Sequence, residues 1–242
     1  MVAFFPRLLL RERSNSWNLV GVAVSPGQTG QSVAPLVRTD GGGYWSCQMT
    51  DVSLSGGGSL RGKDRQKIST LLWRAVRQVC DGGVTPIVVP RNDALFRPWP
   101  EGLSTSDVIV SHDDGASFSD GSEYIQSAID ITCAAASLRD TTLEITILNA
   151  SELQGGESFS ICHPTMGWRL YEIATVEMDT DTTGTITFKP PLREDVATGT
   201  ELEFDKPRCT MRLAAPSSMD LAVAPWTFNT ASASFIETVA AS

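Results

Sequence analysis

The chain has 242 residues, of which 41% are hydrophobic and 19% are charged, and its formal net charge is −9 with a pI near 4.7. A chain of this length buries a core without disulfides or metal ions, and it has room for one large domain or two small ones. The acidic balance and the absence of any run of five basic residues argue against sequence-independent DNA binding, because such binding needs clustered lysine and arginine.

The N-terminal segment MVAFFPRLLLRER is apolar, but Pro6 and Arg7 interrupt it. It is too short to span a membrane and lacks a signal-peptide cleavage pattern, so we expect no membrane insertion. Its apolar side chains are too many to stand free in water. We expect them to dock either on the chain's own core or on a neighbouring subunit. The candidate interface residues are Phe4, Phe5, Leu8, Leu9 and Leu10.

Two strands are predicted before residue 55. One covers residues 17–24 and the other covers residues 44–54. In the second, Trp45, Cys47 and Met49 alternate with polar residues, and this period of two is typical of a strand with one buried face.

The only helix predicted with a clear pattern covers residues 64–81. Asp64 is suited to cap its N-terminus, and Gly82 and Gly83 end it. Six apolar residues recur at helical spacing and predict one stripe that packs on a sheet, with arginine and lysine toward solvent. The stripe consists of Ile68, Leu71, Leu72, Ala75, Val76 and Val79.

After the helix, residues 85–90 predict a strand that is short or lies at an edge, because prolines bound it. Residues 107–126 resemble a hairpin with Asp113, Asp114 and Gly115 at its turn. From Tyr124 onward the pattern fits either one long strand bent at residues 138–140 or a short helix through the alanines.

The C-terminal half alternates apolar and polar residues in short runs separated by turn residues. Six strands in so short a stretch favour a small barrel or a compact sandwich. The predicted strands are residues 143–148, 158–162, 169–178, 184–190, 199–204 and 209–214.

Gly57, Gly62 and Lys63 fit the spacing G-x-x-x-x-G-K of a phosphate-binding loop between a strand and a helix. The next residue is Asp64, where such a loop has serine or threonine to hold Mg²⁺. A carboxylate there would repel the phosphates, so a flexible glycine loop is the favoured interpretation.

No metal site is predicted. Asp113, Asp114, Asp120 and Glu123 lack the regular spacing of a calcium loop, which favours a solvated hairpin tip. The five cysteines are widely spaced with no CxxC pair, so we expect free thiols that are buried or half-buried. They are Cys47, Cys80, Cys133, Cys162 and Cys209.

No catalytic motif is found, and the chain has only two histidines, His112 and His163. We therefore expect no enzyme activity and no cofactor. The alternative is a carbohydrate-binding module or a glycan hydrolase, since glycosidases can work with two carboxylates alone. Such a protein would need several tryptophans on one open cleft. The six candidates are Trp17, Trp45, Trp73, Trp99, Trp168 and Trp226.

Four blocks of the sequence resemble proteins at the tail tip of long-tailed bacteriophages. Two lie in the first half. One is SWNLVGVAVSPGQTGQS together with TDGGGYWSCQMTDVSL, and the other is WRAVRQVCDGGVTPIVVPRND. The third contains the run GTITFKPPLR (Gly184 to Arg193), which leads to the strand residues Met211 to Leu213. The fourth is the closing SMDLAVAPWTFNTASASFIETV. Together they cover well over half of the chain, and the family they most resemble is the distal tail protein.

This resemblance implies a mainly β protein with two modules. A belt-like β-sandwich with one amphipathic helix would use residues 1–137 and 214–242, and a small β-barrel-like module would use residues 138–213. The implied function is a structural subunit of a homohexameric ring in the baseplate, which joins the tail tube to the hub or tip and lines the DNA channel. Its partners would be further copies of itself, the tail tube protein, the hub or tip proteins and the tape measure protein. It would reside in the virion after assembly in the bacterial cytoplasm. A hub subunit or a tube terminator is the alternative within the same class.

Overall fold

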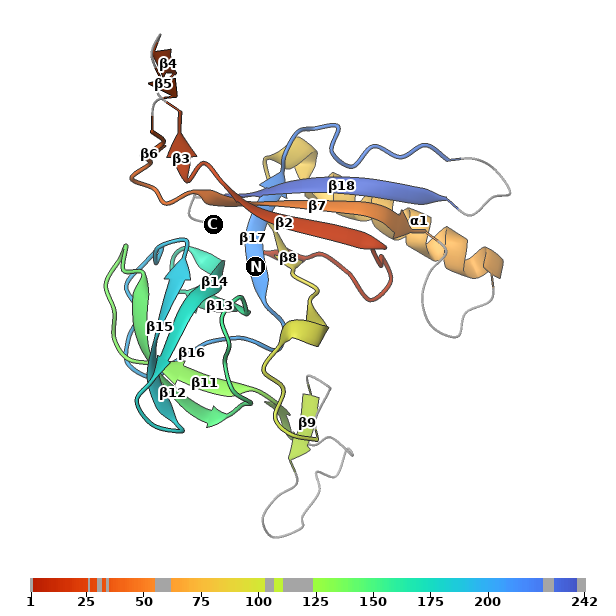
Figure 1. Ribbon diagram of the computed structural model, residues 1–242. Helices are drawn as coiled ribbons and strands as arrows, with labels where there is room; N and C mark the ends of the chain where they lie inside the picture. Colours follow the sequence, from red (N-terminus) through yellow and green to blue (C-terminus); the bar gives the residue numbers. More distant parts are fainter. Residues whose placement is uncertain are drawn as a thin grey trace. The chain divides into compact units, whose positions relative to one another are not determined.

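The structure is a computed structural model that describes residues 2–25, 27–29, 32–33, 35–54, 62–102, 107–110, 124–223 and 229–238. Within these residues the protein is mainly β, with one α-helix and a nearly closed barrel-like sheet, as the sequence predicts. The chain forms two compact units (Figure 1). Unit 1 consists of residues 1–91, 164–168 and 208–242, and unit 2 consists of residues 92–163 and 169–207.

Unit 1 contains a six-stranded sheet with the strand order β1-β8-β17-β18-β7-β2. The two ends of the chain meet in it, since β18 pairs antiparallel with β7 and β17 pairs with both β8 and β18. The strands are β1 (Ala3–Phe4), β2 (Ser14–Val20), β7 (Tyr44–Ser53), β8 (Ile87–Pro90), β17 (Arg208–Leu213) and β18 (Thr230–Glu237). Two short strand pairs, β3 (Ala23–Val24) with β6 (Val37–Arg38) and β4 (Gln28–Thr29) with β5 (Ser32–Val33), extend the connection between β2 and β7.

The alternation predicted for β7 is confirmed. Trp45, Cys47 and Met49 are buried while Gln48 between them is exposed. The strand β8 is short, as predicted, but it is not at the edge of the sheet. Its residues Ile87, Val88 and Val89 are all buried because β1 pairs in parallel along its outer side.

The predicted helix forms as α1 (Gly62–Val79), followed by the 3₁₀ turn η1 (Asp81–Gly83). Asp64 lies inside its first turn rather than at the cap. Figure 1 shows α1 running alongside the sheet that contains β7 and β18. The indole of Trp73 is fully buried and donates a 3.2 Å hydrogen bond to the carbonyl of Met219.

The predicted orientation of α1 was wrong. Its buried side is Ser69, Trp73, Val76 and Cys80, whereas four of the six residues of the predicted stripe are exposed. The helix buries Trp73, the largest of its side chains, together with Ser69, and the aliphatic residues of the predicted stripe therefore lie mostly on another side. The exposed residues are Ile68, Leu71, Ala75 and Val79.

Unit 2 is built around a six-stranded sheet with the order β13-β14-β15-β12-β11-β16. The main chains of Ser160 and Glu203 exchange hydrogen bonds of 3.0 and 2.9 Å, which brings the two ends of the sheet together. The strands are β11 (Asp130–Cys133), β12 (Thr142–Asn149), β13 (Ser158–His163), β14 (Gly167–Met178), β15 (Thr183–Lys189) and β16 (Thr200–Glu201). The 3₁₀ turn η2 (Ala94–Phe96) and the pair β9 (Asp107–Val110) and β10 (Tyr124–Ser127) precede them.

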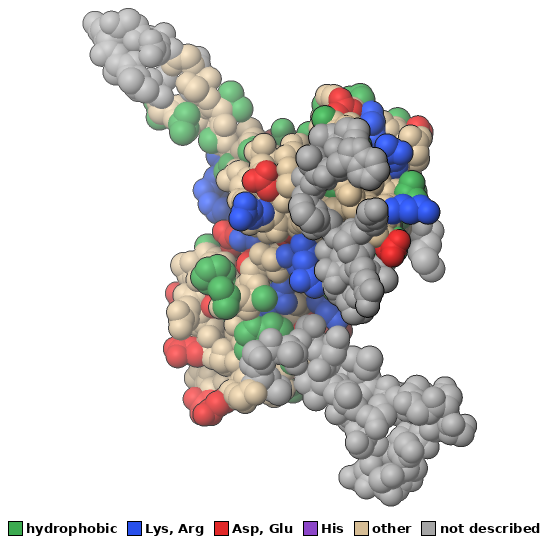
Figure 2. Space-filling model, turned by 90° about the vertical axis from the view of Figure 1, so that its right-hand side faces the viewer, with side chains coloured by type: hydrophobic (Ala, Val, Ile, Leu, Met, Phe, Trp, Pro, Cys, Tyr) green, Lys and Arg blue, Asp and Glu red, His purple; other side chains and the backbone are tan. Residues whose placement is uncertain are grey.

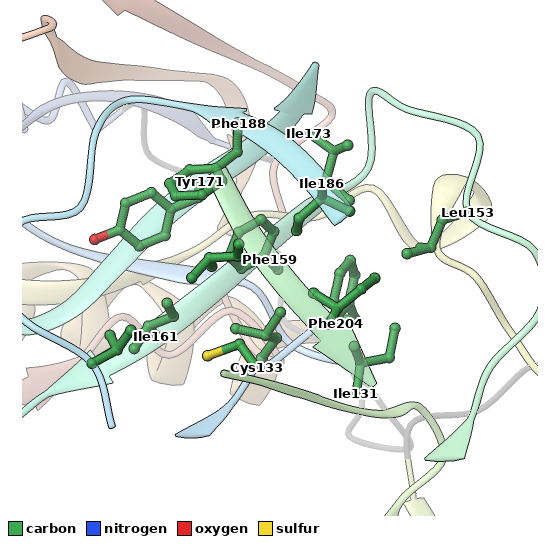
Figure 3. Packing of buried hydrophobic residues seen from close by; sticks show 14 of the residues in the cluster. Ile131, Cys133, Leu153, Phe159, Ile161, Tyr171, Ile173, Ile186, Phe188 and Phe204 are labelled. Carbon is green, nitrogen blue, oxygen red and sulfur yellow. The ribbon is translucent and has the colours of Figure 1, made fainter. Parts of the chain in front are cut away.

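Aromatic rings fill the centre of this barrel (Figure 3). The ring of Phe159 lies 5.4–5.7 Å from those of Tyr171, Phe188 and Phe204, measured between centroids. Because rings of this size pack edge to face or offset at such distances, they form one continuous core.

The division of the chain differs from the predicted one at residues 137/138 and 213/214. Strand β11 belongs to the barrel because it pairs with β12 and β16, and β17 belongs to unit 1 because it pairs with β8 and β18. The segment after Tyr124 forms strands, and the alanines after Cys133 form no helix. Ala136 instead makes a β-bridge with Val196.

Candidate assembly surfaces

The N-terminal arm is anchored on its own unit. Phe5 and Leu10 are buried, and the Phe5 ring meets that of Phe235 edge to face at 5.8 Å. Its neighbours point outward, with Phe4 54% exposed and Leu8 80% exposed. Two of the five candidate interface residues are therefore used internally. For the outward residues an intersubunit contact stays a prediction.

An ion pair holds the arm in place. The guanidinium Nε of Arg7 donates to both carboxylate oxygens of Glu12 at 2.8 and 3.0 Å, and the side chain of Asn15 donates to Glu12 as well. The Glu12 side chain is only 1% exposed. The single Nε–H is thus shared between both oxygens of a buried carboxylate, and this charge-assisted contact helps to fix the backbone that presents the outward residues of the arm.

Phe4 also joins a small cationic–aromatic cluster on the same unit. The guanidinium of Arg208 stacks 4.1 Å from the Trp168 ring and 5.9 Å from the Phe4 ring. Cation–π contacts of this kind fix both the arginine and the rings.

The strand β2 forms one edge of the six-stranded sheet. Its sequence SNSWNLV contains neither a charged residue nor a proline. Along its length it is paired with β7, from Ser14 opposite Thr50 to Val20 opposite Tyr44. Soluble proteins usually protect an edge strand with charges, proline or bulges, because the outer side of such a strand can pair with another strand.

Unit 2 presents two adjacent apolar side chains on η2. Leu95 is 91% exposed and Phe96 is 72% exposed. The turn that carries them is held by a 2.7 Å hydrogen bond from Trp99 Nε1 to the carbonyl of Ala94, and the guanidinium of Arg97 lies over the Trp99 ring. Leu95 and Phe96 line a cavity of about 390 Å³ together with residues 97–98, 151–152 and 154–157.

A second depression on unit 2 combines an apolar floor with an acidic rim. Ile147 and Leu153 are buried at its base and Met178 also lines it, while Glu152 and Asp181 are exposed at its rim. Its volume is about 360 Å³. We call this depression the acidic groove. Figure 2, which shows one face of the molecule, illustrates that hydrophobic and charged side chains both reach the surface in small patches.

The described histidine, His163, is buried inside unit 2 and is only 2% exposed. Its Nε2 lies 2.7 Å from the Tyr171 hydroxyl, which accepts a hydrogen bond from the main-chain N–H of Arg193 at 3.2 Å. Burial lowers the pKa of His163 to about 4, although Glu194 acts in the opposite direction. This neutral, enclosed imidazole is a part of the barrel core.

All five cysteines are free thiols, and Cys47, Cys80, Cys133 and Cys209 are buried as predicted, whereas Cys162 is exposed, contrary to the prediction. Within the part of the chain that the structure describes, no group of three metal-ligating side chains comes together. Among those same residues, no helix is long and apolar enough to cross a membrane.

The five described tryptophans are not collected in one cleft. Trp45 and Trp73 are buried in unit 1, where Trp17 lies edge to face with Trp45 at 6.4 Å and Trp168 stacks against Arg208, and Trp99 belongs to unit 2. Trp226, the acidic residues 113–123 and the glycine loop at Gly57 lie outside the described residues.

A scan against protein-family models finds no match for this chain, and a search of curated proteins finds none either.

Proposed function

We propose that this chain is a structural subunit of a closed ring at the distal end of a bacteriophage tail. It would be a distal tail protein that joins the tail tube to the hub or tip and lines the channel through which DNA passes. The ring would contain six copies. Its partners would be further copies of itself, the tail tube and hub proteins and the tape measure protein, in the virion.

The observation that carries the assembly part of this proposal is the edge strand β2. It offers seven uncharged residues at the end of a six-stranded sheet. Pairing between identical neighbours around a rotation axis covers such edges without opening a path to fibres. In a permanent assembly of this kind, each interface would bury more than about 1,000 Å².

The tail assignment depends on the sequence resemblance, and the fold agrees with what that resemblance implies. A sheet with one helix is formed by the two ends of the chain, and a small barrel-like sheet is inserted between them. The formal charge of −9 also suits a channel that must let DNA pass without holding it.

The proposed role is structural and involves no chemical step. The described histidine is buried and neutral, which makes it a poor acid or base for an external substrate. Incubation of the pure protein with peptidoglycan or host polysaccharide should release no products. Hydrolysis that disappears when a single carboxylate is replaced would contradict this part of the proposal.

The experiment that tests the whole proposal is electron microscopy of tails that carry the chain with a small affinity tag, labelled through the tag. We expect label at the junction of tail tube and tip, and six copies per ring in a reconstruction. Label at the head-proximal end would indicate a tube terminator. A single copy, or a position outside any ring, would refute the proposal. Purified protein alone does not decide it, because ring closure can require the tube or hub as a template.

A further inference from the structure

The helix α1 has an apolar row on its outward side. Ile68, Leu71, Ala75 and Val79 are exposed and follow one another at i, i+3, i+7 and i+11. Residues at this spacing lie on one side of a helix. We call this row the outward stripe. Residue contacts of α1 with the rest of unit 1 lie on another side, where Trp73 meets Met219 and Arg77 meets Asp220.

Basic side chains flank the centre of the stripe. Lys67 lies one turn before Leu71 and Arg74 lies one turn after it, and both are exposed. The helix as a whole carries five lysines or arginines and one aspartate, a formal charge of +4, in a chain whose net charge is −9. The most basic element of an otherwise acidic protein thus carries an unusually exposed apolar row.

The acidic groove of unit 2 has the complementary chemistry. Its apolar lining consists of Met178, Ile147 and Leu153, which can contact an apolar side chain, and the carboxylates of Glu152 and Asp181 at its rim can pair with cations. Opposite charges at an interface mainly guide association and fix its register.

The groove is held firmly by the turn between β14 and β15. The Thr180 hydroxyl accepts hydrogen bonds from the main-chain N–H groups of Thr182 and Thr183 at 3.2 and 3.0 Å. The carbonyl of Thr182 accepts a 2.7 Å hydrogen bond from the N–H of Ile147, which ties this turn to β12. A preorganised surface costs less conformational entropy when it binds.

We propose that the acidic groove of one copy of this chain receives the outward stripe of α1 from a second copy, with Leu71 over Met178 and with Lys67 and Arg74 facing the acidic rim. The contact joins two different surfaces, so it is a head-to-tail interface of the kind that forms closed rings or filaments. The inference builds on the proposed function, because it names the surfaces through which neighbouring subunits meet.

Cross-linking between separately purified chains tests this contact. The background variant is Cys162→Ser, which removes the exposed thiol. One sample carries Leu71→Cys and an affinity tag, and the other carries Met178→Cys without a tag. A disulfide forms only where the two Cα atoms come within about 7 Å. We expect a mixed dimer between tagged and untagged chains on mild oxidation of the mixture.

Three results would overturn the inference. The first is no mixed dimer at any accessible concentration. The second is cross-linking of the Leu71→Cys sample with itself in preference to the mixture, which would indicate a helix–helix contact. The third is a disulfide within one chain when both substitutions are placed together and the protein is dilute.

Charge reversal provides the specificity control. Lys67→Glu with Arg74→Glu should reduce the yield of mixed dimer at least tenfold, and adding Glu152→Lys with Asp181→Lys to the partner chain should restore it. Arg139→Glu, at an exposed arginine that belongs to neither surface, should leave the yield unchanged. An undiminished yield in the reversed pair would contradict the assignment. If the chain forms a ring at the tail tip without this cross-link, only this inference fails; if it is absent from any tail ring, the proposed function fails.

Discussion

The indole nitrogen of Trp73 donates a 3.2 Å hydrogen bond to the main-chain carbonyl of Met219, a residue 146 positions away in the sequence. Both residues are fully buried. This one contact fixes which side of α1 faces the sheet and ties the helix to the segment that leads into the last strand.

Replacing Trp73 by alanine should therefore destabilise the protein strongly. Removing a buried tryptophan typically costs about 3–5 kcal/mol, and here the Met219 carbonyl also loses its partner. The free energy of unfolding, measured by urea denaturation, should fall by that amount. Leu71→Ala is the matched control on the exposed side of the same helix and should change it by less than about 0.5 kcal/mol. Equal effects at the two positions would contradict the observed orientation of α1.

The strands were largely predictable from the sequence, because their signal is local. Trp45, Cys47 and Met49 show the period of two that a half-buried strand requires, and turn residues separate the strands of the barrel. The existence of α1 was likewise visible in its spacing. The orientation of α1 was not predictable, because the spacing pattern counts the apolar Ile68 and Leu71 and ignores the small, polar Ser69, which is buried.

Features that depend on pairing between distant segments could not be read from the sequence. The unit boundaries depend on the pairing of β11 with β16 in the barrel and of β17 with β18 in the other sheet. These pairings join separate stretches of the sequence. The acidic groove is similar, since Ile147, Glu152 and Asp181 come from separate segments that the fold brings together. The sequence did identify the apolar N-terminal arm. It could not show that Phe5 turns inward while Phe4 turns outward.

Gly184 is required by the close approach of β14 and β15. A Cβ atom at this position would lie 2.7 Å from the carbonyl oxygen of Glu177 and 3.0 Å from the Cα atom of Met178. Because both are main-chain atoms, they cannot move aside without distorting the strand pair. Gly184→Ala should lower the free energy of unfolding by about 1–3 kcal/mol.

The control for this substitution is Gly41→Ala, where an added Cβ meets nothing within 4 Å. It should be neutral or slightly stabilising, since alanine reduces the conformational entropy of the unfolded chain. A loss of stability at Gly41 as large as that at Gly184 would show that the effect is not caused by crowding between the strands.

The cysteines should differ sharply in reactivity. Burial raises the pKa of the Cys80 and Cys133 thiols to about 11, and it raises that of Cys47 further. Cys162 is exposed. Because the thiolate is the reactive form, the native protein should react rapidly with a thiol reagent at Cys162 alone, and at all five cysteines in denaturant. Mass spectrometry of the labelled peptides would identify the sites. Rapid labelling of Cys47 in the native protein would contradict its burial in the sheet.

Stability should fall as the pH is lowered from neutral, because His163 is neutral in the folded protein. Its pKa is about 4 when folded and about 6.5 when unfolded, so the unfolded chain binds more protons between these values. The stabilisation is therefore complete above pH 6.5 and is lost as the pH falls toward 4. A shift of this size corresponds to about 3 kcal/mol.

The comparison to make is the free energy of unfolding against pH for the natural chain and for His163→Gln, which cannot titrate. The difference in slope between pH 6.5 and 4 isolates this histidine, because every other titrating group is common to both. Parallel curves would mean that the imidazole next to Tyr171 is not buried in its neutral form.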